Sequence, residues 1–190
     1  MSADEFHVHG PHDHEVEHAA LSGDPFSARL AVMTAIFATF GALFGYMVGA
    51  TQNDALLFKN DSAIRKTEAS DQWNFYQAKS NKQNLAELGA VLAGSADAAR
   101  FKSEAERYNK EKQEILVNAQ ALEKRSTELE AKSEASMHVH HRFAQAMTLI
   151  QIAIALAAIT LLTRSRWLQY VSYGAAAISV AIGGLALLHV

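Results

Sequence analysis

Three long stretches without a charged residue dominate the hydropathy pattern of the chain. They run over residues 30–53, 143–163 and 167–188. Each exceeds the roughly 20 residues that a helix needs to cross about 30 Å of hydrocarbon at about 1.5 Å per residue. The pattern therefore predicts an all-α membrane protein whose three transmembrane helices cover residues 28–53, 143–163 and 167–190.

A long polar segment, residues 54–142, separates the first predicted span from the second. It contains no proline and is rich in Ala, Glu, Lys, Gln and Leu, which are strong helix formers. Its conspicuous helix breakers, Gly89 and Gly94, lie close to the middle. A turn near Gly94 would bring Asn53 opposite Ser136, so that both legs would return to the membrane at nearly the same level. We therefore predict a long antiparallel helical hairpin between the first and second spans, which would reach on the order of 60 Å from the bilayer.

The second leg of this hairpin carries a heptad pattern. Large residues fall mostly on one seam position and small or polar residues on the other, which is typical of a coiled coil that a neighbouring helix approaches closely. The seam residues are Phe101, Ala105, Tyr108, Lys112, Ile115, Ala119, Leu122, Ser126, Leu129, Ser133 and Ser136.

The other segments are short and polar. Residues 1–27 form a histidine-rich tail without the apolar residues needed for a core, and residues 164–166 form a short basic loop. The segment 52–54 (Gln-Asn-Asp) supplies polarity at the membrane interface, where the helix could restart. Because the first apolar stretch is too long for a cleavable signal peptide and the tail is acidic, we expect an uncleaved anchor.

Composition sharpens this picture. The mean hydropathy of −0.03 resembles that of a soluble protein, but the average conceals the segregation of apolar and polar segments. Of the 17 basic residues, 14 lie in residues 54–142, where 14 acidic residues balance them. A nucleic-acid-binding surface needs a clear basic excess, so we expect no nucleic-acid partner. Cysteine is absent, which excludes disulfides and thiolate metal sites.

The charges near the predicted spans bear on orientation. Short basic loops favour the cytoplasm, whereas loops longer than about 60 residues cross the membrane largely regardless of charge. This predicts a cytoplasmic N-terminus and loop 164–166, with the arm on the opposite side. The basic residues that flank the membrane on the arm side argue for the reverse; they are Lys59, Arg65, Lys66, Lys132 and Arg142.

Two predicted spans carry small residues on one face, which lets helix backbones approach closely in lipid. These residues are Gly41, Gly45 and Gly49 on the first span and Ala175, Ser179 and Gly183 on the third. We predict that these faces pack in a homo-oligomer, since the seam of the arm independently suits a partner helix. Packing between the helices of a single chain is the alternative.

Histidines form two groups that could bind Zn, Ni or Cu, because neutral imidazole is a common ligand for these metals. The candidate ligands are His7, His9, His12 and His14 in the tail, His138, His140 and His141 where the second leg enters the membrane, and His189. The spacing defines no fixed ligand set. A solvated tail and interfacial polar residues are the alternative interpretation, and we expect no firmly bound cofactor.

Chemistry-bearing motifs are otherwise missing from the sequence. The predicted spans contain no Asp, Glu, Lys or Arg near mid-membrane, which argues against an ion-coupled transporter. Phosphate-binding glycine loops, a Gly-x-Ser-x-Gly motif and paired carboxylates are absent. We therefore expect that the protein is not an enzyme.

The most distinctive run lies in the first leg, at residues 71–80. On a helix Trp73, Tyr76 and Ser80 share a face, with Lys79 beside them. Packing within the hairpin is one interpretation of this face. Docking of another membrane subunit is the other.

This run, Asp-Gln-Trp-x-x-Tyr-Gln-Ala-Lys-Ser, stands after one predicted membrane helix and before two more. In both respects the chain resembles the uncharacterised bacterial membrane proteins known as domain of unknown function 4337. The resemblance covers most of the chain but not the histidine-rich tail. It implies the same layout and a location in the bacterial inner membrane, and it carries no activity or active-site residues.

Three hypotheses about function result. The first is a structural or scaffolding membrane protein that self-assembles through its glycine-faced helix and its coiled-coil arm. The second is a histidine-based metal-binding or metal-sensing membrane protein. The third is an accessory subunit of a larger membrane complex.

Overall fold

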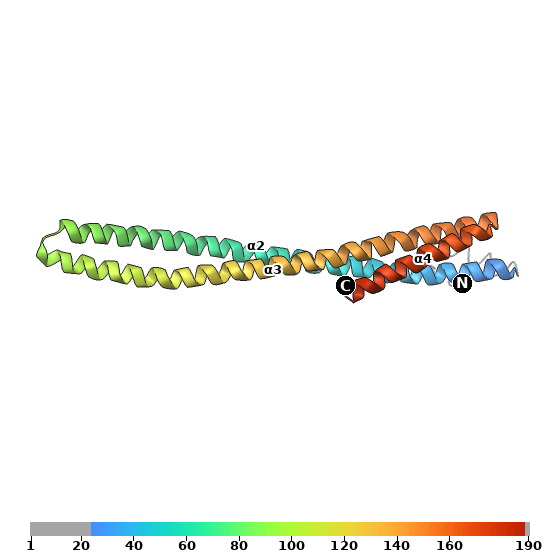
Figure 1. Ribbon diagram of the computed structural model, residues 1–190, viewed down its shortest axis with the longest axis horizontal. Helices are drawn as coiled ribbons and strands as arrows, with labels where there is room; N and C mark the ends of the chain where they lie inside the picture. Colours follow the sequence, from blue (N-terminus) through green and yellow to red (C-terminus); the bar gives the residue numbers. More distant parts are fainter. Residues whose placement is uncertain (1–23, 189–190) are drawn as a thin grey trace, which may run out of the picture. The chain divides into compact units, whose positions relative to one another are not determined.

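The computed structural model describes residues 24–188, without the side chains of Ser95 and Ala96, and this part of the chain is all-helical. Helix α2 spans Pro25–Leu92, α3 spans Ser95–Thr163 and α4 spans Arg166–Leu187 (Figure 1). Residues 24–188 contain no strand. Each helix is long and apolar enough, over part of its length, to cross a membrane. The predicted all-α class is confirmed for these residues.

Helix α2 begins three residues before the predicted span. Asp24 caps it: Oδ1 accepts the backbone N–H of Phe26 at 3.2 Å, and Oδ2 accepts the hydroxyl of Ser27 at 3.0 Å. Pro25 suits the first helical position because its φ is already helical and it has no N–H to leave unpaired. Residues 25–27, which we assigned to the tail, therefore form the first turn of α2.

Both long helices continue through the predicted membrane boundaries. Helix α2 has 68 residues and does not restart at residues 52–54; α3 has 69 residues. The strong helix formers Ala55, Leu56 and Leu57 directly follow the polar residues 52–54, and no proline interrupts the segment, so the helix continues. The chain breaks instead between Leu92 and Ser95, at the predicted turn. There the carbonyl oxygen of Gly94 accepts the N–H groups of Asp97 and Ala98, both at 3.1 Å, and opens the first turn of α3.

The described residues divide into two compact units. The apolar unit comprises residues 24–52 and 137–188, and the polar unit comprises residues 53–136. The sequence pattern had put these boundaries after residues 53 and 142.

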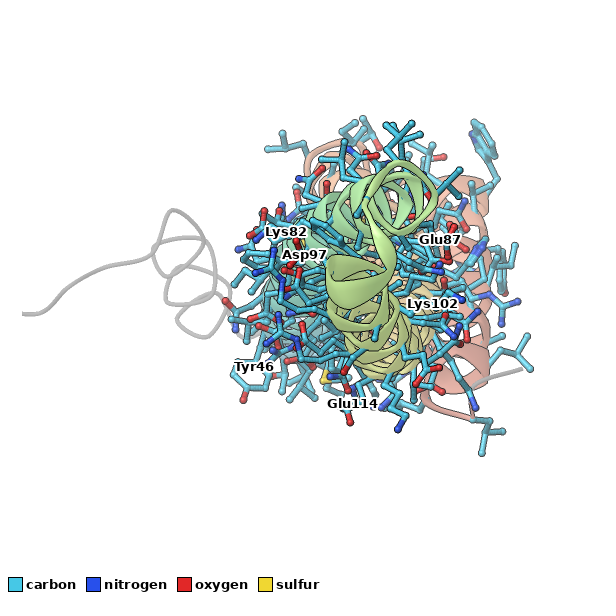
Figure 2. All side chains as sticks on the ribbon, turned by 90° about the vertical axis from the view of Figure 1, so that its left-hand side faces the viewer. Tyr46, Lys82, Glu87, Asp97, Lys102 and Glu114 are labelled. Atoms are coloured by element: carbon cyan, nitrogen blue, oxygen red, sulfur yellow. The ribbon has the colours of Figure 1, made fainter. Side chains whose placement is uncertain are left out.

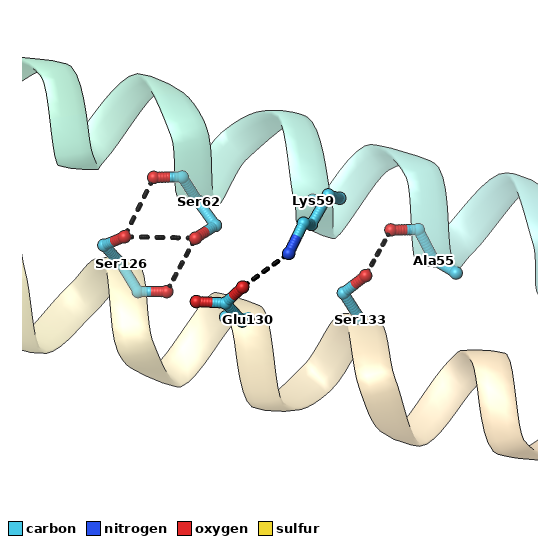
Figure 3. A network of polar contacts seen from close by, with 6 residues as sticks. All are labelled: Ala55, Lys59, Ser62, Ser126, Glu130 and Ser133. Carbon is cyan, nitrogen blue, oxygen red and sulfur yellow. Dashed lines mark hydrogen bonds and ion pairs between the residues drawn. The ribbon is translucent and has the colours of Figure 1, made fainter.

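In the polar unit, α2 and α3 lie side by side, joined through small residues (Figure 1). The hydroxyls of Ser62 and Ser126 donate to each other's backbone carbonyls at 2.9 and 3.0 Å, and the two hydroxyl oxygens lie 3.0 Å apart (Figure 3). The Ser133 hydroxyl donates to the carbonyl of Ala55 at 2.8 Å. All four residues are buried. Their side chains are short, so the two backbones approach closely and every buried hydroxyl is satisfied.

The seam predicted on the second leg is the face by which α3 contacts α2. Every residue on it is buried or partly buried. Partners further along α2 lie earlier along α3: Ser62 meets Ser126, whereas Gly89 meets Phe101. A Cβ at position 89 would lie 3.0 Å from the Phe101 ring, so any larger residue there would require the ring to shift.

The apolar unit packs α2, α3 and α4 around aromatic and small side chains. Phe44 and Phe143 are buried with ring centroids 6.3 Å apart. Around them lie Phe37, Ala146, Ile150, Ala153, Ala176 and Ala186. Because alanine occupies so many core positions, the helix backbones lie close to one another.

A larger residue at the centre of the small seam should destabilise the polar unit. We expect Ser126→Leu to lower the free energy of unfolding by about 1–3 kcal/mol, because its side chain would be forced between two closely packed backbones. The measurement is the thermal unfolding of the purified full chain, followed by far-ultraviolet circular dichroism. Thr127→Leu is the matched control, since Thr127 is exposed and its hydroxyl bonds only to its own helix. Equal melting of the two variants would contradict the prediction.

Candidate functional site

The glycines of the first span lie against the chain's own α3. A Cβ at Gly41 would lie 3.5 Å from Cγ2 of Ile150, and one at Gly45 would lie 3.6 Å from Cε of Met147. Gly49 has no such neighbour within 4 Å. Two of the three glycines predicted to pack between copies therefore have a neighbour within the chain.

The small residues predicted on the third span also contact the chain's own helices. The Ser179 hydroxyl is buried and donates to the carbonyl of Ala146 at 2.6 Å. A Cβ at Gly183 would lie 2.6 Å from Cζ of Phe44, and Ala175 packs partly buried against the same core. These contacts support packing within one chain, the alternative that the sequence left open. They do not test self-assembly through other faces.

The adjacent glycines 183 and 184 provide a matched test of this packing. A methyl group at 183 meets the Phe44 ring, whereas one at 184 meets no atom within 4 Å. We expect Gly183→Ala to lower the stability of the apolar unit by about 1–3 kcal/mol. Gly184→Ala should leave it unchanged or raise it by up to about 1 kcal/mol, because alanine favours the helix. Unfolding of both variants in mixed micelles checks this, and a less stable Gly184→Ala than Gly183→Ala would refute it.

Polar side chains also lie on the outer surface of the apolar unit. Gln145, Thr148 and Gln151 are exposed on α3, inside the predicted second span. The Thr148 hydroxyl is satisfied by the carbonyl of Ala144 at 2.9 Å. Within residues 24–188, neither glutamine amide has a side-chain hydrogen bond. Gln145 and Thr148, together with His141, line a shallow groove of about 690 Å³ that also touches Ile182 of α4.

His140 joins α3 to α2. Its Nδ1 lies 3.0 Å from the carbonyl oxygen of Val48. A carbonyl only accepts hydrogen bonds, so Nδ1 must carry the proton and is not free to bind a metal. The ring of His141 lies 5.5 Å from that of His140, measured between centroids. His138 and His141 are exposed.

No group of three or more His, Cys, Asp or Glu residues within residues 24–188 is arranged to hold a metal ion. The other predicted ligands lie outside the described residues; they are His7, His9, His12, His14 and His189. Metal binding by histidines stays a prediction.

The Trp73 face is directed at α3. The Trp73 Nε1–H donates to a carboxylate oxygen of Glu123 at 2.9 Å, and its ring meets that of Tyr76 edge-on, with centroids 5.6 Å apart. Lys79 pairs with Glu111, and Ser80 is partly buried. These contacts support the packing interpretation of the face.

A polar groove nevertheless remains beside Trp73. It has a volume of about 600 Å³ and is lined by residues that include Ser70, Asn74, Gln77 and Thr127. The docking of another subunit on this side of the polar unit stays a prediction.

Two ion pairs connect the helices of the polar unit at their edges. Lys59 pairs with Glu130 (Figure 3), and Lys79 pairs with Glu111. The hydrogen bond and then the charge of Lys59 lower the pKa of Glu130, and the same bond raises the pKa of Lys59. The hydrogen bond from Lys79 lowers the pKa of Glu111. Solvent screens both pairs, so they contribute little individually.

One contact was missed by the sequence analysis. The guanidinium of Arg164 lies 3.2 Å from Oδ2 of Asp24, which brings the α3–α4 loop to the start of α2. Arg164 has a φ of 53°, a left-handed conformation uncommon outside glycine. The N–H of Phe26, the Ser27 hydroxyl and the Arg164 charge together lower the pKa of Asp24. The Asp-Pro pair before an apolar run is a helix-start signal that could have identified the cap, but not its distant partner.

The lowered carboxyl pKa values predict a pH dependence. Charged Glu111 and Glu130 stabilise the folded polar unit above the pKa of an unfolded glutamate, and this contribution is lost as the pH falls through their lowered folded pKa values. We expect the melting temperature of the wild type to fall more steeply below about pH 4 than that of the Glu111→Gln/Glu130→Gln variant. High salt should reduce the difference.

The control for this titration is Glu106→Gln/Glu114→Gln, which changes two exposed carboxylates of α3 without a side-chain ion pair in the described residues. It should follow the wild-type curve. If both double variants reduce the fall in melting temperature at acid pH equally, the two ion pairs are not the cause of that fall.

Taken together, the described residues form an all-helical protein with three long apolar helices and a polar unit inserted between the first two apolar segments. The chain belongs to the family described as Domain of unknown function (DUF4337), whose match covers residues 26–189. The family predicted from the Trp73 motif is therefore confirmed. Comparison with curated proteins and with solved structures gave no match.

Proposed function

We propose that the chain is a structural integral membrane protein of the bacterial inner membrane that self-assembles. Its apolar unit would span the membrane three times, and residues 54–142 would form an antiparallel, coiled-coil-like arm outside the lipid. The role is one of scaffolding, without catalysis.

The distribution of side chains in the apolar unit supports membrane insertion. Large aliphatic residues point outward, among them Ile36, Leu43, Ile152, Ile159 and Ile178. The buried positions are instead rich in alanine and serine, packed around the phenylalanines of the core. Lipid favours this arrangement, because apolar side chains can face hydrocarbon while small residues let the helices approach.

The observation that carries self-assembly is the outward position of Gln145 and Gln151. An amide facing hydrocarbon without a partner is costly, whereas amides that hydrogen-bond across helices stabilise their association. A second copy of the chain would supply such partners. Assembly would therefore use this face of α3, while Gly41, Gly45, Ser179 and Gly183 hold each chain together.

Orientation follows from the charged loops. We propose that the N-terminus and residues 164–166 are cytoplasmic and that the arm is periplasmic. The Asp24–Arg164 contact supports the part of this proposal that puts the start of α2 and the α3–α4 loop at one end of the apolar unit.

Native mass spectrometry of the protein released from membranes tests self-assembly. We expect a defined homo-oligomer for the wild type. Gln145→Leu/Gln151→Leu should raise its dissociation constant about thirtyfold, because each interhelical amide contributes roughly 1 kcal/mol.

The matched control is Thr148→Val, which removes a polar group from the same face whose hydroxyl bonds only to its own helix. It should leave the oligomer intact. Monomeric wild-type protein would overturn the proposal, as would an unchanged oligomer in the double glutamine variant.

The same spectra address the other two hypotheses. A histidine-based metal site predicts bound Zn, Ni or Cu that is lost when His138, His140 and His141 are replaced by alanine. An accessory subunit predicts chains of different mass in the complex.

A further inference from the structure

The outer side of α2 in the polar unit carries an apolar stripe with no partner. Residues at seven-residue steps lie opposite the buried series Ala55, Ser62 and Ala69, which contacts α3. The outward series is Leu57, Ile64, Asp71, Ala78, Leu85 and Leu92, and all six are exposed. Leu85 is 67% exposed and Leu92 is 76% exposed.

The corresponding outer side of α3 is different. It carries charged residues such as Lys110, Glu114 and Lys124, and the large exposed apolar residue among its described side chains is Val117. The outward stripe of α2 contains a single charged residue, Asp71. Near the turn, Figure 2 shows Lys82 and Glu87 on opposite sides of α2, so these charges flank the stripe without interrupting it. A helix that faced only water on this side would not need two apolar series, one inward and one outward.

We infer that this stripe is an interface with a second copy of the chain, in which the two α2 helices pair in parallel. The inference rests on the proposed function, because it requires an arm outside the lipid and copies that enter the membrane in the same direction. Identical chains then present α2 in parallel, and each residue meets its own equivalent across a two-fold axis.

Asparagines beside the stripe suit it to pairing with the same stripe of a second copy. Three asparagines lie three residues after members of the outward series, on a line made of Asn60, Thr67, Asn74, Asn81 and Leu88. Asn74 also lines the groove beside Trp73. In a parallel pair these positions form the second line of the seam. An asparagine amide carries both donor and acceptor, so it can pair with an identical amide at the same level. Such pairs favour the in-register arrangement, which forms three of them, whereas a shift by one heptad keeps only one, between Asn74 and Asn81, and sets the remaining Asn81 against Leu88.

Asp71 is the one position that opposes the pairing, because two carboxylates would meet at the same level. Replacing it therefore gives a signed test. Asp71→Asn should lower the dissociation constant of the homo-oligomer about fivefold, since removing two like charges is worth roughly as much as a surface charge pair. Leu85→Glu, which changes an exposed residue and spares the fold, should have the opposite effect.

The absence of cysteine makes cross-linking a direct readout. Single cysteines at Asn74, Asn81 or Leu88 should form disulfide-linked dimers when native membranes are oxidised, because residues on the seam bring their Cβ atoms within disulfide distance. Cysteines at Val117 and Ala121, which are exposed on the outer side of α3, are the matched controls and should remain mostly monomeric. Adding Leu85→Glu to the Asn81→Cys variant should abolish its dimer.

Each other outcome is decisive. Equal cross-linking from both helices, cross-linking from α3 alone, or a cross-link to a chain of different mass would overturn the inference. If native mass spectrometry finds an oligomer but the α2 cysteines do not react, the inference that the stripe is the interface is overturned. The proposed function would still stand. A monomeric wild type would overturn the proposed function and, with it, the inference.

Discussion

Close approach of helix backbones is the constraint on which the rest of the structure depends. In the polar unit, serine hydroxyls reach across to backbone carbonyls of the neighbouring helix, as Ser62, Ser126 and Ser133 do. In the apolar unit Ser172 and Ser179 do the same. Such bonds form only where both side chains at the contact are small. One kind of contact therefore joins the helices both in the apolar unit and in the polar unit.

Because the small residues are used for packing within the chain, they determine which helix faces remain free to contact other molecules. The glycine faces and the α3 seam, which the sequence indicated for assembly, are largely occupied within the chain. What is left is chemically specific: outward glutamines on α3 and an outward apolar stripe on α2. Assembly by this protein would thus depend on side chains that its own fold leaves unsatisfied, rather than on the residues that allow the closest packing.

The sequence predicted that the chain is helical, but it could not predict which helix faces pack within the chain. Charge-free stretches and runs of strong helix formers are local signals, so they were sufficient to predict the all-α class of residues 24–188. The choice between internal and external packing could not be predicted, because Gly41 looks the same whether Ile150 or a second copy lies against it. The pairing of Asp24 with Arg164 joins residues 140 positions apart and has no local signature. The interruption expected at residues 52–54 failed because polarity alone does not end a helix.

The two buried serines of α4 also constrain how this helix can dock on α3. Ser172 and Ser179 are seven residues apart, and they bond to carbonyls of Ala153 and Ala146 that are seven residues apart in the reverse direction. A lone helix in lipid can satisfy such hydroxyls from its own preceding turn. When α4 docks on α3, these local hydrogen bonds are replaced by two bonds to α3, and both can form in only one alignment of the two helices. A shift of α4 along α3 would therefore break both hydrogen bonds at once.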